Sequence, residues 1–316
     1  MNKSFKVAVL MGGESREREI SLRSGKAVLD SLLENKIDAI SFDPKRKSLF
    51  ELTQHKVDLA FVALHGKFGE DGTAQAILEF LKIPYTGSGV ASSALAMDKI
   101  LTKRVWKTLN IETPAFRPVD SQENHEVLDL SFDYPVIVKP NDEGSSLGVI
   151  KVNDKKTINT ALKETFKLCD KALIEKFVIG REFTCTLLKD PDSQVVNALP
   201  IIEIKAPNGE YNYHNKYLGK KTKYICPAQI PERIEDLIKT KSLEAFSALG
   251  CEGWGRVDLM WDEINSPQLI ELNTVPGMTT QSLVPMSSAA AGICFDDLVV
   301  RILKTASLGK KGAKDD

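Results

Sequence analysis

Two short stretches near the carboxyl end of the chain carry the residue types best suited to metal and phosphate chemistry. Residues 253–258 read Gly-Trp-Gly-Arg-Val-Asp, and residues 271–277 read Glu-Leu-Asn-Thr-Val-Pro-Gly. We expect both to be strands, in which side chains two residues apart share one face. Their polar residues are Arg256, Asp258, Glu271 and Asn273. Two carboxylates and an amide oxygen suit Mg²⁺, and an adjacent arginine can hold a phosphate in bidentate fashion.

The alternative for these stretches is the solvated face of an ordinary antiparallel hairpin. Turn residues at 262–267 fit either interpretation. Apolar neighbours on both strands disfavour a solvated face, since they indicate a buried setting. These neighbours are Leu259, Met260, Leu269 and Ile270.

A loop rich in glycine and serine indicates phosphate binding. Residues 143–148, Glu-Gly-Ser-Ser-Leu-Gly, lie between predicted strands at 135–139 and 149–152. Backbone N–H groups and hydroxyls of such a loop can hold phosphates, although an ordinary flexible turn has the same composition. Lys139, which closes the first strand, supports the phosphate hypothesis. The chain has neither a Walker A sequence nor GxGxxG, so the two commonest nucleotide signatures are excluded.

Polar residues also follow the predicted strands of the amino-terminal part. His65 comes after the apolar run 57–64, and Glu17 lies in the loop after the run 5–11. Open α/β sheets bind ligands at such strand ends, but a structural histidine and a capping glutamate fit equally well. Lys99 falls in a predicted helix, where an exposed lysine is the usual case. No nucleophile with a partner base stands out, so metal, lysines and loop together favour phosphoryl transfer by positioning and charge neutralisation.

Composition sets the broad class. The chain has 316 residues, of which 42% are hydrophobic and 27% charged, as in an ordinary soluble protein of two or three packed units. A net charge of −1 gives no global field, so we expect neither nucleic acid nor a membrane as partner. No apolar run is long enough to span a bilayer. Five scattered cysteines without CxxC indicate reduced thiols, hence a cytoplasmic protein.

Hydrophobic patterns divide the chain into three parts and a tail. Strand, helix, strand, strand and helix in the first part predict an open α/β sheet. The second part contains the phosphate-loop hairpin, and we interpret its residues 118–131 as a polar surface connection. The third contains an amphipathic helix at 232–249 before the metal-type hairpin. The predicted parts are 1–96, 97–188, 189–308 and a flexible tail at 309–316.

Seven motifs in one order resemble the D-alanine–D-alanine ligase family of the ATP-grasp superfamily. They cover residues 5–304 and read MGGESREREISL, ALHGKFGEDGTAQ, PYTGSGVASSALAMDK, PVIVKPNDEGSSLGV, KYLGKKTKYICPA, GCEGWGRVDLM and ELNTVPGMTTQSLVPMSSAAAG. The resemblance implies an α/β protein with α+β character in its ATP-binding part, where nucleotide lies between central and C-terminal subdomains. It implies ATP-driven ligation of two D-alanines through D-alanyl phosphate, for peptidoglycan synthesis. We expect a bacterial, cytoplasmic homodimer.

The resemblance also assigns roles to residues at matching positions. The ligands of two Mg²⁺ ions, or of Mn²⁺, would be Asp258, Glu271 and Asn273. The residues around the ATP phosphates would be Lys99, Lys139, Lys216, Glu143, Ser145 and Ser146. Those around adenosine would be Glu175, Lys176, Phe177, Val178 and Glu182.

The remaining assignments concern the two D-alanine subsites. The first subsite would be formed by Glu17 and His65, and the second by Ser282 and Leu283. Arg256 and the Gly277 backbone would form the oxyanion hole of the tetrahedral intermediate. Ser145 and Tyr217 would hydrogen-bond with Glu17 and close loops over the site.

Departures from the family pattern are few. Glu14 stands where relatives often have Thr or Ser, and Val275 stands where they have Ser. Asn141 and Asp142 replace a more usual Ser-Arg pair, which leaves one charge interaction of the phosphate loop open. None of these changes removes a proposed catalytic group.

Three alternatives stay open at this point. A neighbouring ligase would make D-alanyl-D-lactate or D-alanyl-D-serine, but Tyr217 disfavours the former because those relatives tend to carry Phe there. A nucleotide-binding regulatory protein without turnover would have lost a metal ligand or lysine. A dinucleotide-dependent oxidoreductase would have GxGxxG and no use for the carboxylate cluster.

Overall fold

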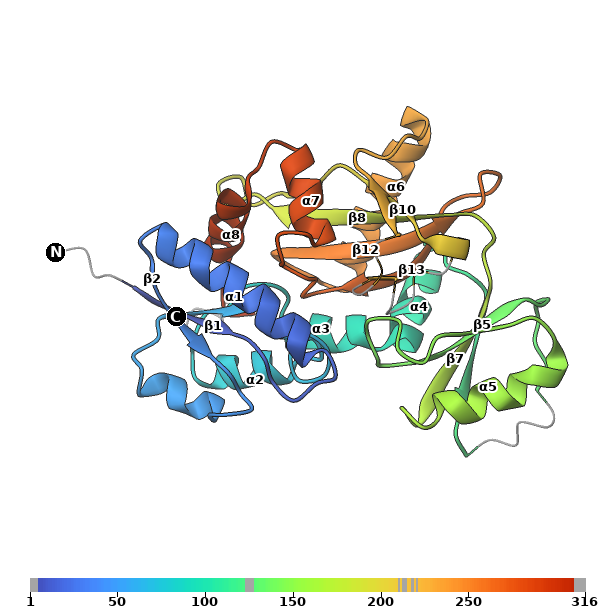
Figure 1. Cartoon of the computed structure of the whole chain (residues 1–316), viewed down its shortest axis with the longest axis horizontal. Helices are drawn as coiled ribbons and strands as arrows, with labels where there is room; N and C mark the ends of the chain where they lie inside the picture. Colours follow the sequence, from blue (N-terminus) through green and yellow to red (C-terminus); the bar gives the residue numbers. More distant parts are fainter. Residues whose placement is uncertain are drawn as a thin grey trace, which may run out of the picture.

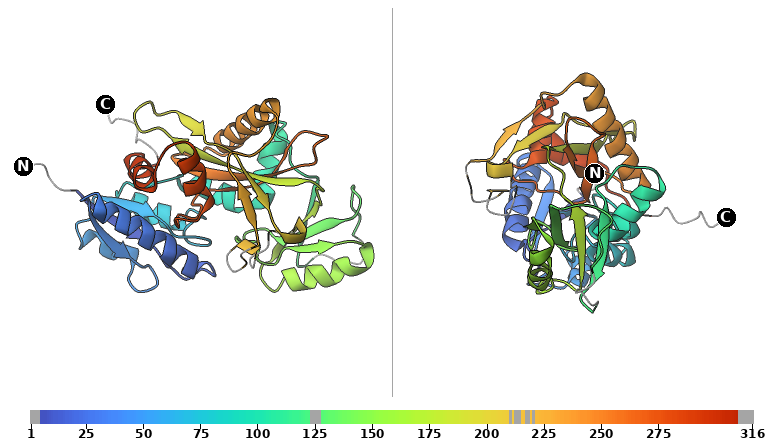
Figure 2. Two further views of the ribbon diagram at one scale, coloured as in Figure 1. Left: turned by 45° about the horizontal axis from the view of Figure 1, so that its top comes forward. Right: turned by 90° about the vertical axis from the view of Figure 1, so that its right-hand side faces the viewer.

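The computed structural model of the chain describes residues 5–122, 128–209, 211, 215–216, 219 and 221–309. Its described strands form three sheets (Figure 1). Figures 1 and 2 show the amino-terminal sheet at one end of the long axis and the central sheet at the other. The largest sheet lies between them.

The amino-terminal sheet is parallel, as predicted. Strand β1 (Lys6–Leu10) lies between β2 (Asp38–Phe42) and β3 (Leu59–Val62). Its continuous apolar run is buried on both faces, which is typical of a central parallel strand. Helix α1 (Arg18–Glu34) follows β1 in the chain, and α2 (Thr73–Phe80) follows β3.

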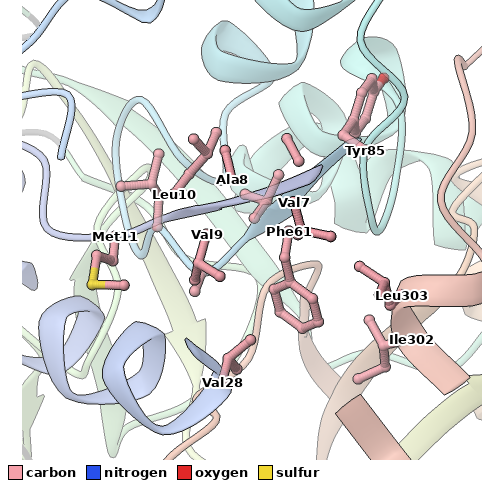
Figure 3. Packing of buried hydrophobic residues seen from close by; sticks show 14 of the residues in the cluster. Val7, Ala8, Val9, Leu10, Met11, Val28, Phe61, Tyr85, Ile302 and Leu303 are labelled. Atoms are coloured by element: carbon pink, nitrogen blue, oxygen red, sulfur yellow. The ribbon is translucent and has the colours of Figure 1, made fainter. Parts of the chain in front are cut away.

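The end of the chain returns to this amino-terminal core. Helix α8 (Phe295–Lys304) places Ile302 and Leu303 beside Val7 and Phe61 (Figure 3). Because all four side chains are essentially excluded from water, this packing fixes the carboxyl-terminal part against the amino-terminal sheet.

The central sheet carries the phosphate-loop hairpin. Its order is β4 (Phe116–Asp120), β7 (Lys171–Lys176), β5 (Val136–Pro140) and β6 (Ile150–Val152), with α5 (Ile158–Thr165) packed on it. The antiparallel pairing of β5 with β6 confirms the predicted hairpin.

Strand β4 corrects one prediction. We interpreted residues 118–131 as a surface connection, yet 118–120 pair with β7 and bury Val119. The strand is a short edge strand with one fully buried side chain and a proline, so it shows no period-2 pattern in the sequence.

The largest sheet contains the metal-type hairpin at one edge. Its path is β11 (Lys223–Ile225), β10 (Ile202–Lys205), β8 (Arg181–Lys189), β12 (Trp254–Trp261) and β13 (Gln268–Asn273), and β9 (Val196–Ala198) pairs with β8. Helix α6 (Glu232–Ala248) packs on this sheet, and α7 (Leu283–Ala290) follows the hairpin. Since β8 is central here, we propose that the boundary of the last part lies near residues 177–180 rather than at 188.

Two helices connect the sheets. Helix α3 (Val90–Met97) leads into α4 (Lys99–Thr108), whose amino terminus is capped by Asp98. Trp106 anchors α4 in the core of the largest sheet and donates from Nε1 to the Ala245 carbonyl at 3.3 Å. Short 3-10 helices occupy Leu49–Thr53, Lys155–Thr157 and Pro207–Gly209. Within the described residues, no single helix is long and apolar enough to cross a membrane. Helices α7 and α8 reach that length and composition only as a pair, and the pair is bent by 104°.

Candidate active site

A cavity between the central and largest sheets collects most of the residues that we predicted around ATP. It is bounded by β5 and β7 on one side and by β12 and β13 on the other. The predicted residues that line it are Lys99, Lys139, Glu143, Ser146, Glu175, Lys176, Phe177, Val178, Glu182, Lys216, Asp258 and Glu271. Residues from five motifs therefore meet in one place.

Apolar side chains that we did not predict form much of the remaining wall. They are Ile137, Leu147, Val149, Leu259, Met260 and Ile270. Two of them had a signal in the sequence, because Ile137 and Met260 lie two residues from Lys139 and Asp258 on the same strands. Such a wall suits a flat apolar ring system beside a charged region.

The two carboxylates of the metal-type hairpin lie directly opposite each other. Asp258 on β12 is the register partner of Glu271 on β13, and Arg256 is the partner of Asn273. Opposed residues of an antiparallel pair have Cβ atoms about 5 Å apart, and like charges there repel. The arrangement therefore requires nearby cations.

Cations of the protein contact both carboxylates. Arg256 donates to both oxygens of Asp258, from Nε at 2.8 Å and from Nη2 at 2.7 Å. The Lys99 ammonium lies 3.6 Å from Glu271 Oε2. Burial by itself would raise the pKa of Glu271, but Lys99 and the other cations around it lower that pKa to about 2. Glu271 is therefore ionised at neutral pH.

The donor set of this hairpin fits a divalent cation. Asn273 donates from Nδ2 to Asp258 Oδ2 at 3.2 Å, a contact that does not use its amide oxygen. In the described part of the chain, no group of three or more His, Cys, Asp and Glu side chains is arranged to hold a metal alone. Two carboxylates and one amide oxygen instead suit Mg²⁺ that completes its shell with phosphates and water.

A second set of charges lies in the same cavity. Glu175 is buried, and its Oε2 atom is 2.7 Å from the Lys139 ammonium. Its Oε1 atom is 3.3 Å from the ammonium of Lys103, a fully buried residue that we did not predict. Burial raises the pKa of Glu182 to about 7, with Lys216 acting in the opposite direction.

The predicted phosphate loop lies against Glu17. Ser145 Oγ donates to Glu17 Oε1, and a Cβ atom at Gly144 would come within 2.6 Å of Glu17 Oε2. Ser145 and Ser146 have φ angles of 52° and 57°, a left-handed conformation that costs free energy and recurs at ligand-binding loops. Lys99 Nζ donates to the Glu143 carbonyl at 2.7 Å. Lys99 therefore contacts both the phosphate loop and Glu271.

The predicted histidine lies behind this contact. His65 is buried, with Nδ1 2.9 Å from the Val275 carbonyl and Nε2 2.9 Å from Ser24 Oγ. Burial lowers the pKa of His65, but the facing carboxylate of Glu70 and other neighbours raise it above its ordinary value. Glu70, which follows the same predicted strand as His65 and was assigned no role, also borders a small cavity beside Gly144 and Asn273. This second cavity adjoins the first.

The residues predicted for the second amino-acid subsite lie at the start of α7. Ser282 Oγ accepts from the Thr279 backbone N–H at 3.0 Å, and Leu283 is the first residue of the helix. A Cβ atom at Gly277 would meet Ser282 Oγ at 3.0 Å. Tyr217 lies outside the described residues, so its predicted bond with Ser145 is not described.

The departures at Asn141 and Asp142 have defined contacts. Asn141 Oδ1 accepts from the Ile100 backbone N–H at 2.9 Å, which fixes the start of α4 next to the loop. Asp142 Oδ2 is 3.0 Å from the Lys67 ammonium, so its charge is balanced by the amino-terminal part. Val275 is buried, and its backbone carbonyl holds His65.

Comparisons with known proteins test the family resemblance. The family model described as "D-ala D-ala ligase C-terminus" matches residues 105–304, and that described as "D-ala D-ala ligase N-terminus" matches residues 43–88. A D-alanine–D-alanine ligase of Pseudoalteromonas translucida is 45% identical over 306 residues, covering 96% of this chain and 98% of the relative.

Solved structures give the same result. The D-alanine–D-alanine ligase of Bacillus anthracis complexed with ATP superposes with a TM-score of 0.80 at 34% identity, covering 95% of this chain and 97% of that one. The VanG D-Ala:D-Ser ligase of Enterococcus faecalis superposes with a TM-score of 0.82 at 28% identity, covering 95% and 98%. The predicted ATP-grasp fold is confirmed, and the chain belongs to the D-alanine–D-alanine ligase family.

Proposed function

We propose that this protein joins two D-alanine molecules to D-alanyl-D-alanine at the expense of ATP. One observation carries the proposal: the opposed carboxylates Asp258 and Glu271 share a cavity with Lys99 and Lys139. A carboxylate pair next to several ammonium groups suits a polyphosphate with divalent cations. We assign the amino-acid substrate to the adjoining cavity beside the phosphate loop.

The proposed reaction has two steps, which follow the order of the subsites. A carboxylate oxygen of the first D-alanine attacks the γ-phosphorus of ATP, and the bond to the bridging oxygen breaks, giving D-alanyl phosphate and ADP. The amine nitrogen of the second D-alanine then attacks the acyl carbon, and inorganic phosphate leaves. Neither step needs a covalent enzyme intermediate, consistent with the lack of a nucleophile–base pair in the sequence motifs.

Residues of this chain bind and orient the reactants in this scheme. Glu17, which accepts a hydrogen bond from Ser145, is proposed to bind the ammonium group of the first D-alanine. The ammonium of Lys99 neutralises phosphate charge and keeps the loop backbone at Glu143 in place. Arg256 and the Gly277 backbone are proposed to stabilise the oxyanion of the second step. Ser282 and Leu283, at the start of α7, are proposed to hold the carboxylate of the second D-alanine.

The metal assignment is part of the same proposal. Asp258, Glu271 and Asn273 would hold Mg²⁺, or Mn²⁺ in its place, as two ions. Bound there, the ions neutralise charge on the transferred phosphoryl group. We further propose, as before, that the enzyme is a homodimer in the bacterial cytoplasm and supplies dipeptide for peptidoglycan.

Phosphate release from ATP tests the proposal most directly. The protein with Mg²⁺ is supplied separately with D-alanine, L-alanine, D-serine and D-lactate, and then with D-alanine plus each of the last two. We expect phosphate release with D-alanine alone, and D-alanyl-D-alanine as the product by mass spectrometry. Release that requires D-serine or D-lactate would assign the chain to a variant ligase instead. ATP binding without release under any condition would contradict ligase activity.

A further inference from the structure

Lys103 is a fully buried lysine to which none of the roles above has been assigned. It lies on α4 one turn after Lys99, and its side chain has no exposed surface. Burial lowers the pKa of Lys103 to about 8, against the opposing effect of Glu175. A buried ammonium is costly unless it is paired, so its contacts indicate what keeps it there.

Glu175 is the first of these contacts, and it is shared. Its two oxygens face Lys103 at 3.3 Å and Lys139 at 2.7 Å. Among the described residues, those lining the cavity between the central and largest sheets include Lys139 and Glu175 but not Lys103. Lys103 therefore lies behind the carboxylate, and Lys139 lies in front of it.

Thr113 is the second contact. The Lys103 ammonium donates to Thr113 Oγ1, and the Thr113 hydroxyl donates to the Leu269 carbonyl at 2.8 Å. Leu269 lies on β13, two residues before Glu271. Lys103 consequently connects α4, β7 and β13, the three elements that carry Lys99, Glu175 and Glu271.

The net charge of the cluster formed by Lys103, Glu175 and Lys139 depends on Lys103. Two lysines and one glutamate sum to a formal charge of +1, so the carboxylate cannot neutralise both ammonium groups. Lys103 pairs with Glu175 on the side away from the cavity, so Lys139 keeps an excess positive charge that faces the cavity. Without Lys103, the remaining ion pair of Lys139 and Glu175 would be neutral, and the carboxylate would compete with nucleotide for Lys139.

We propose that Lys103 is a positioning residue for the nucleotide, which acts by holding Glu175 so that the Lys139 ammonium is available to ATP. The inference rests on the proposed ATP-dependent function. It assigns Lys103 no contact with substrate. Its effect is expected on nucleotide affinity and not on the proposed amino-acid subsites, because its contacts with Glu175 and Thr113 do not involve residues of those subsites.

Lys103→Met removes the charge with little change in side-chain length. We expect ATP to bind about tenfold or more weakly, since a charge-assisted hydrogen bond to Lys139 is impaired. Equilibrium ATP binding in Mg²⁺ measures this, and KM for ATP should rise while KM for D-alanine stays within about twofold. Lys107→Met is the matched control, because Lys107 is exposed on the same helix with its ammonium 5.4 Å from the Phe116 ring.

A second substitution separates positioning from support of the fold. Because Glu175 is itself proposed to lie beside adenosine, Lys103→Met is also made in a Glu175→Gln background and compared with Glu175→Gln alone. Lys139 is then unneutralised with or without Lys103, so ATP binding should recover to that of the Glu175→Gln protein. A lysine that merely supports the fold predicts no such recovery. Lys103→Gln, whose amide can still donate to Thr113, replaces Lys103→Met in both measurements if the latter does not fold.

The outcomes are distinguishable. A folded Lys103 variant that binds ATP as wild type does would overturn the proposal, as would the absence of recovery in the double variant. Wild-type protein that binds no ATP would overturn the proposed function itself. Weaker ATP binding with recovery in the double variant supports the role of Lys103.

Discussion

Replacing Glu271 with glutamine removes one of the two opposed carboxylates while almost preserving side-chain shape. In the metal-free protein, nearby cations lower the pKa of Glu271 from 4.5 to about 2 despite its burial. That difference of about 2.5 pH units corresponds to about 3 kcal/mol of favourable interaction at neutral pH. The side chain keeps 23% of its surface exposed, and we reduce the figure to about 2 kcal/mol for solvent screening.

The sign of the pH dependence follows from the direction of the pKa change. A carboxyl group with a lowered folded-state pKa stabilises the protein above its unfolded pKa, here 4.5. That contribution is lost as pH falls toward the folded-state value of about 2. The stability difference between wild type and Glu271→Gln should therefore be about 2 kcal/mol at pH 7 and shrink toward zero between pH 4.5 and 2.

Urea unfolding in EDTA at pH 7, 4 and 3 measures this difference. Glu244→Gln is the control, because Glu244 is a surface partner of Lys241 with 48% of its side chain exposed. Its loss should cost less than about 1 kcal/mol with little pH dependence. If Glu271→Gln equals or exceeds wild-type stability at pH 7, repulsion from Asp258 outweighs attraction by the lysines, and our account of the charge balance is refuted.

Three further substitutions test separate contacts. Asp258→Asn should lower turnover by about 100-fold or more with folding retained, measured by phosphate release and circular dichroism; near-normal turnover at limiting Mg²⁺ would remove Asp258 from the metal site. Gly144→Ala should raise KM for D-alanine, because the added Cβ would lie 2.6 Å from Glu17 Oε2. The control Gly89→Ala, whose Cβ would have its nearest neighbour at 3.7 Å, should leave KM unchanged. Equal KM values for the two variants would show that the loop shifts to accommodate the methyl group. Asp142→Lys should increase hydrogen exchange in the phosphate loop through repulsion by Lys67, and adding Lys67→Glu should restore protection. The change in the free energy of loop opening should be at most about 1 kcal/mol, because the pair is half-exposed. Unchanged exchange would mean that the pair does not hold the loop.

Much of the fold was predictable because local patterns coincide with its elements. The apolar run of β1, the amphipathic α6 and the hairpin of β12 and β13 each have a periodicity that matches their burial. The opposition of Asp258 and Glu271 was predictable for the same reason, since strand alternation and a short turn determine which side chains share a face.

Contacts between distant segments were not predictable in this way. Lys103 resembles any lysine on an amphipathic helix, and only the packing of α4 against two sheets shows that it is buried. The ion pair of Lys67 with Asp142 joins residues 75 positions apart, and neither position has a distinguishing local pattern. The strand β4 was missed because pairing with β7, rather than its own composition, makes it a strand.

The charge balance of the cavity explains how it stays folded without nucleotide and still binds it. In this structure the ammonium groups of Lys99 and Lys139 are paired with Glu271 and Glu175. In the proposed reaction, divalent cations that bind Glu271 would release Lys99 for phosphate, so the positive charge of the site would be neutralised before and after binding. Such an exchange of partners avoids leaving a buried charge unpaired at either stage. The two lysines then differ in how they become available: a metal would release Lys99, whereas Lys139 depends on Lys103, which pairs with the other oxygen of Glu175.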